Sequence, residues 1–110
     1  MGQKGDSLTN ASTQAAEDLQ RRLSNLGDVS IKKMFGGYGV FESGVMFALV
    51  DSGGGVYLKA DASNRERFEE AGSNKHVRMP YFMIPEKVLG NDSDLLEWAQ
   101  ISMVVARKAK

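Results

Sequence analysis

The hydrophobic pattern of the first quarter of the chain has a helical period. Apolar and small residues recur at spacings of three and four between residues 8 and 26, and the charged residues lie off that stripe. This pattern predicts one amphipathic helix. Ser7 or Thr9 is the expected N-cap, and Gly27 is the expected left-handed residue that ends the helix.

After Gly27 the period changes from that of a helix to that of strands. In residues 30–35, Ile31, Lys33 and Phe35 alternate with Lys32 and Met34, so the two sets face opposite sides. The two residues Ser43 and Gly44 separate the next two apolar runs, and such a short link is typical of a tight hairpin. The predicted strands are residues 30–35, 38–42, 45–51, 56–59 and 81–84.

Two further helices are predicted in the second half. Asp61 or Ser63 caps a short middle helix, Ser63 and Glu66 form a possible capping box, and Gly72 ends it. The last helix starts within residues 91–94 and runs to about Arg107.

Helices and strands are grouped along the chain rather than regularly alternating. This order favours an α+β fold, a two-layer sandwich in which N-terminal, middle and C-terminal helices cover an antiparallel sheet of about five strands. Residues 1–7 hold no apolar anchor before Leu8 and are expected to form a flexible N-terminus. Residues 8–110 form the single domain.

The third predicted strand is apolar on both sides, whereas a sheet face in contact with water should carry polar residues. Strict alternation assigns one side to Val45, Phe47 and Leu49 and the other to Met46, Ala48 and Val50. Either helices cover both faces of the sheet, or a partner subunit or bound chain covers the second face.

Composition narrows the classes of function. The 110 residues contain 14 basic and 14 acidic side chains, one His and no Cys. Without cysteine there is no thiolate metal site or cysteine nucleophile, and the protein fits a reducing cytoplasm. The chain has no apolar run of the ~20 residues that a membrane span needs. Because the charges balance, we expect no direct sequence-specific binding of nucleic acid.

The residues that could carry chemistry have simpler structural explanations. Gly53–Gly55 leads into a strand rather than a helix, which is wrong for a nucleotide-binding loop. His76 stands alone, so neither a metal site nor a nucleophile activated by a base is expected around it. We therefore predict no catalytic residue, no metal and no cofactor.

One stretch carries a family resemblance. Residues 33–41, KMFGGYGVF, continue in GVMFALV at residues 44–50 and VYLKAD at residues 56–61. From about residue 15 to the C-terminus the chain resembles the TfoX/Sxy N-terminal domain family. The resemblance implies an α+β fold of the secretion-chaperone-like kind and a homodimer. Named members of the family are regulators of natural competence, and the family supplies no catalytic residues.

The sequence thus favours a non-enzymatic regulatory or adaptor domain that acts through protein contacts, as a homodimer or with a regulatory protein partner. A small-ligand or peptide-binding module is the alternative, and a small enzyme is a more distant one. The candidate interaction surface is built from the glycine-rich strip and the strands after it. Its residues are Lys33, Phe35, Gly36, Gly37, Tyr38, Phe41, Met46 and Tyr57.

Overall fold

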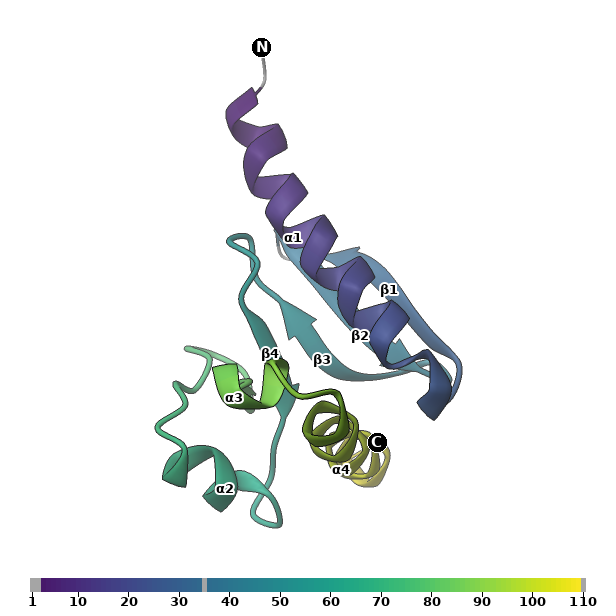
Figure 1. The fold of residues 1–110 in the computed structure, drawn as a ribbon, viewed down its shortest axis with the longest axis vertical. Coiled ribbons are helices and arrows are strands. Elements are labelled where there is room, and N and C mark those ends of the chain that lie inside the picture. Colours follow the sequence, from purple (N-terminus) through teal and green to yellow (C-terminus); the bar gives the residue numbers. More distant parts are fainter. Residues whose placement is uncertain (1–2, 35, 110) are drawn as a thin grey trace.

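The computed structural model describes the backbone of residues 3–34 and 36–109, and the side chains of residues 11–34 and 36–109. It confirms the α+β fold, with helices on one side of a five-stranded antiparallel sheet of order β1-β2-β3-β4-β5 (Figure 1). The elements in chain order are α1 (Gln3–Arg22), the 3-10 turn η1 (Ser24–Leu26), β1 (Val29–Met34), β2 (Gly37–Glu42), β3 (Val45–Val50), β4 (Val56–Lys59), α2 (Arg65–Glu70), β5 (Tyr81–Met83), α3 (Glu86–Leu89) and α4 (Asp92–Ala109).

The first helix differs from its predicted bounds at both ends. It begins at Gln3, so neither Ser7 nor Thr9 is its N-cap, and residues 3–7 of the segment expected to be flexible are helical. It ends at Arg22, and η1 begins at Ser24. Gly27 follows η1 with φ 155° and ψ −160°, a positive φ that favours glycine but is not the left-handed helical conformation. The left-handed stop predicted at Gly27 is therefore wrong.

The hairpin between β2 and β3 is confirmed. Ser43 and Gly44 both have positive φ, 52° and 85°, as a two-residue turn with the right-handed twist of the strands requires. Gly44 takes this conformation without steric cost, because it has no Cβ.

The short helix α2 is stopped as predicted but started differently. At its end, Gly72 has φ 76°, and the backbone N–H groups of Gly72 and Ser73 donate to the carbonyl oxygens of Glu69 and Phe68. These two bonds form a Schellman motif. At its start, Asn64 is the N-cap residue. Ser63 and Glu66, both among the described residues, do not form the predicted capping box.

A single core joins the helices to one face of the sheet. Leu19 of α1, Phe68 of α2, Val88 of α3 and Leu95 of α4 belong to the same buried cluster as Val40, Ala48 and Leu58 of the strands. Figure 1 shows α1 in front of β1 and β2, with α4 on the same side of the sheet. Both long helices therefore lie on one side, which we call the helix face. No helix within the described residues has the length and apolarity that crossing a membrane requires.

A β-bulge in β3 overturns the strict alternation expected for this strand. Val40 pairs with Ala48 and Phe41 pairs with Met46, so Phe47 is an extra residue between them. The extra residue shifts the alternation by one position. Phe47, Ala48 and Val50 all join the helix-face core, while Leu49 shares the opposite side with Met46. The sequence grouped Ala48 and Val50 with Met46, and this grouping is wrong.

Candidate functional site

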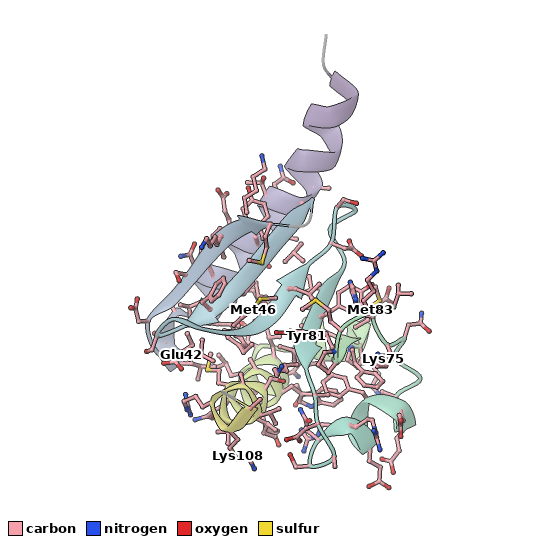
Figure 2. All side chains as sticks on the ribbon, turned by 180° about the vertical axis from the view of Figure 1, so that it is seen from behind. Glu42, Met46, Lys75, Tyr81, Met83 and Lys108 are labelled. Atoms are coloured by element: carbon pink, nitrogen blue, oxygen red, sulfur yellow. The ribbon has the colours of Figure 1, made fainter. Side chains whose placement is uncertain are left out.

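The side of the sheet turned away from α1 carries an apolar surface without a helix on it (Figure 2). The strand register assigns to it the residues that alternate with the core positions. We call this surface the open face. Its apolar side chains outside the buried Tyr81 are Met34, Phe41, Met46, Leu49, Tyr57 and Met83, and its charged strand residues are Lys32 and Lys59.

A cluster of thioethers and an aromatic ring lies at the centre of the open face. A Cβ placed on Gly39 would lie 2.8 Å from the Met34 sulfur, 3.1 Å from the Met46 sulfur and 3.0 Å from an edge carbon of the Phe41 ring. The three side chains thus converge over the bare backbone of Gly39. All three remain half-buried, so the cluster is in contact with solvent.

Leu49 shows how apolar this surface is. It is only 5% exposed, yet it does not belong to the core cluster beneath the helices. Because its side chain lies on the open face, neighbouring strand side chains must cover it. The open face therefore contains a small hydrophobic layer of its own.

One end of the open face is bordered by the loop before β5. Residues 74–76 pair with β5, where the His76 N–H donates to the Tyr81 carbonyl and the Met83 N–H donates to the Asn74 carbonyl, 2.8 and 2.9 Å. The His76 ring packs edge-on against Tyr57, with ring centroids 5.3 Å apart. Its Nδ1 accepts the backbone N–H groups of Arg78 and Met79. The lone histidine thus fixes the loop that borders the open face.

Two phenol groups of this region have raised pKa values. Burial raises the pKa of Tyr81 to about 12. Partial burial raises the pKa of Tyr57, and the nearby Asp51 carboxylate adds to the shift because it repels the phenolate and accepts the Tyr57 hydroxyl at 3.2 Å. Both shifts extend the neutral form of the phenol further into the alkaline range than in a free tyrosine.

A cavity of about 440 Å³ lies where the open face meets the loop. Met34 and Leu49 line it from the sheet, and His76, Arg78 and Met79 line it from the loop. A second cavity, of about 730 Å³, lies between α2, α3 and the start of α4, with Trp98 in its wall. The open face contributes Met34 and Leu49 to the first cavity and Met83 to the second.

The structure brings together some of the predicted interaction residues and separates others. Phe41, Met46 and Tyr57 lie on the open face as expected. Lys33 and Tyr38 are paired on the opposite side, and the Tyr38 hydroxyl lies 2.8 Å from Thr13 Oγ1 of α1. Tyr38 therefore anchors α1 rather than a partner.

The glycine strip serves the fold. A Cβ on Gly37 would lie 1.9 Å from the Val50 carbonyl oxygen, so β2 approaches β3 as only glycine permits. Gly36 has φ 75° in the turn between β1 and β2. Phe35 lies outside the described residues.

Sequence reasoning missed several members of the open face. Lys32 and Met34 were assigned to one side of β1, but nothing connected that side to Met46. Two pairings would have placed Met34 and Met46 on the same face of the sheet: Phe41 with Met46 in the hairpin, and β1 with β2. Leu49 could not be found in this way, because its position depends on the bulge. Within the described side chains, no group of three His, Asp or Glu residues is placed to hold a metal ion.

The comparison with known proteins concerns most of this structure. A family model, the TfoX N-terminal domain, matches residues 21–106. The match runs from the end of α1 into α4 and includes every strand, hence the whole open face. It is shorter at both ends than the resemblance expected from about residue 15 to the C-terminus. No curated protein matches the chain. The chain belongs to the TfoX N-terminal domain family.

Proposed function

We propose that this protein is a non-enzymatic regulatory or adaptor domain, similar to the N-terminal domain of competence regulators, and that it acts through protein contacts made by the open face. The observation that carries the proposal is a half-buried methionine and aromatic cluster on the side of the sheet that the described helices leave uncovered. Methionine side chains adapt to differently shaped partners, and both methionine and aromatic residues are enriched at protein interfaces.

The chemistry of the one histidine supports a non-enzymatic role. His76 Nδ1 accepts two backbone N–H groups, and its ring packs on Tyr57. A general base needs a free lone pair within reach of the proton that it removes. The Nδ1 lone pair is committed to holding the loop instead.

A photo-crosslinking amino acid tests the contact surface. It replaces Met46 at the centre of the open face or, as the matched control, the exposed Gln100 of α4. We expect a discrete protein adduct from position 46 in native cells and none from position 100. The crosslinked protein, once identified and purified, should form the same adduct at position 46. Phe41→Asp should block this crosslink, because it places a charge beside Met46. Adducts of equal yield from both positions, or from neither, would contradict the proposal.

The cavity of about 440 Å³ supports a second candidate function, the binding of a small ligand or a peptide side chain. Its volume lies within the range of small-molecule sites, and thioether and aliphatic groups line it beside the His76 ring and the Arg78 guanidinium. A thermal-shift screen against a metabolite library tests it. A stabilising compound whose effect disappears in Leu49→Trp, which fills the cavity, would favour this function over the protein contact.

A further inference from the structure

The charges on the open face have one sign. At the strand positions of this face the described charged residues are Lys32 and Lys59, and none is acidic. Lys32 is exposed, and the Lys59 ammonium lies 5.3 Å from the centroid of the Tyr81 ring. The methionine cluster is thus flanked by ammonium groups on β1 and on β4.

The bordering loop adds a third cation and an apolar protrusion. Arg78 is exposed and lines the cavity with Met34 and Leu49. Its neighbour Val77 is 91% exposed, the largest value among the exposed large apolar residues of the described chain. Both side chains are therefore available to a partner that lies across the open face and reaches the loop.

One acidic residue, Asp51, lines the cavity beside the open face together with Arg78. Asp51 Oδ1 accepts the N–H groups of Gly53 and Gly55 at 3.0 and 2.7 Å, and its Oδ2 accepts the Tyr57 hydroxyl. These neutral donors leave the negative charge of Asp51 in place, so one carboxylate beside the turn between β3 and β4 stands against three cations.

We infer that the open face binds an acidic amphipathic helix of a partner protein, whose apolar side chains pack on the methionine cluster and whose carboxylates meet Lys32, Lys59 and Arg78. This inference rests on the proposed function and names the chemistry of the partner. Sheets accept helices on their apolar faces, and this sheet already carries α1 and α4 on its other side. A third helix would complete a three-layer arrangement, with the adaptable thioethers at its centre.

Charge also decides against a second copy as the occupant. A two-fold axis would place the open face against itself and bring the Lys32, Lys59 and Arg78 side chains of two chains to one interface. Like charges across an interface oppose association, whereas carboxylates on a partner would be attracted. The homodimer expected from the family resemblance stays a prediction, and these charges disfavour the open face as its contact surface.

The test uses methionine methyl groups as local reporters. The full chain is labelled with 13C at the methionine methyls and titrated at physiological salt with two stapled helical peptides of about 18 residues. Both have one leucine face, and one carries Glu on the flanks where the other carries Lys. We expect the acidic peptide to shift the methyls of Met34, Met46 and Met83 and to leave the core residue Met103 unchanged. Three surface ion pairs should make its affinity about tenfold higher than that of the basic peptide.

Two neighbouring lysines provide the matched pair of variants. Lys32 and Lys33 are both exposed on β1, but Lys32 lies on the open face and Lys33 pairs with Tyr38 on the helix face. Lys32→Glu should weaken binding of the acidic peptide about fivefold, and Lys33→Glu should weaken it less than about twofold. The far-ultraviolet circular dichroism of both variants should match that of the parent chain, which shows that they fold.

The outcomes separate this inference from the proposed function. Equal affinity for both peptides at the methionine methyls would overturn the acidic-partner inference and leave the contact surface standing. If neither peptide shifts these methyls, the inference is overturned, while the crosslink at Met46 would still test the function. Shifts that grow with protein concentration alone would make a second copy the occupant. Stronger shifts with phosphatidylglycerol vesicles than with the acidic peptide would make it a membrane surface.

Discussion

Gly37→Ala tests the close approach of β2 to β3 on which the open face is built. The added Cβ would lie 1.9 Å from the Val50 carbonyl oxygen and 3.1 Å from the Asp51 carbonyl carbon, both of them backbone atoms. Real Cβ contacts essentially never fall below 3.0 Å, so the two strands must separate locally by about 1 Å. A side-chain rotation cannot relieve this clash.

The cost follows from two contributions. Overpacking of a rigid site costs about 1–3 kcal/mol, and weakening the adjacent backbone hydrogen bond costs about 1 kcal/mol more. We therefore expect Gly37→Ala to lower the free energy of unfolding by about 3 kcal/mol. For a domain of this size, such a loss lowers the melting temperature by about 10 °C or more.

Gly39→Ala is the matched control in the same strand. Its Cβ would meet the ends of Met34, Phe41 and Met46, which are side chains that can rotate away. Its expected cost is about 1 kcal/mol or less. Urea unfolding followed by circular dichroism measures both variants. If Gly37→Ala unfolded within about 0.5 kcal/mol of the parent chain, or Gly39→Ala were the less stable of the two, the close approach would be refuted.

Three further changes test other parts of the structure. Gly44→Val places a β-branched residue at φ 85° and should lower the free energy of unfolding by about 1 kcal/mol or more, and an unchanged urea midpoint would contradict the turn. Because the pKa of Tyr81 is raised to about 12 in the folded protein, its neutral phenol contributes about 2 kcal/mol of stability below pH ~10. This contribution is lost as the pH rises toward ~12, and Tyr81→Phe should flatten the loss. His76→Phe keeps the ring but removes the acceptor, so the Arg78 and Met79 amides should exchange their hydrogens faster, and unchanged rates would show that the two bonds are not formed.

Local signals in the sequence predicted most of the fold because each depends on a few neighbouring residues. The Ser43–Gly44 turn needs only two residues that accept positive φ. Gly72 ends α2 because its N–H bonds to the Glu69 carbonyl and the N–H of the next residue, Ser73, bonds to the Phe68 carbonyl. Periodicity also located β4 at its observed bounds. Such signals do not depend on the rest of the molecule.

The failures lie where tertiary contacts decide. The bulge at Phe47 allows two consecutive residues, Phe47 and Ala48, to pack in the helix-face core. No residue type in β3 predicts this bulge. Asn64 displaced Ser63 as the N-cap of α2 because its side chain accepts the Asp61 N–H and donates to the Lys59 carbonyl, which ties the helix to β4. The short helix α3 after Pro85 was not predicted.

The candidate site was predicted in part for the same reason. Met46, Phe41 and Tyr57 were chosen because they are apolar residues of successive predicted strands, and the register places them on one face. Lys33 and Tyr38 were chosen for their place in the family string, which does not specify a side of the sheet. The position of Leu49 and the uniform charge of the open face became visible only when the five strands were aligned.

The proposed function requires that the isolated chain leaves its methionine-rich sheet face open to solvent. Relaxation of the 13C-labelled methionine methyls by a soluble paramagnetic agent tests it most directly. We expect strong relaxation at Met34, Met46 and Met83, and protection at Met103, which is 3% exposed on the buried side of α4. Protection of the open-face methyls as complete as that of Met103, in the protein alone, would contradict it.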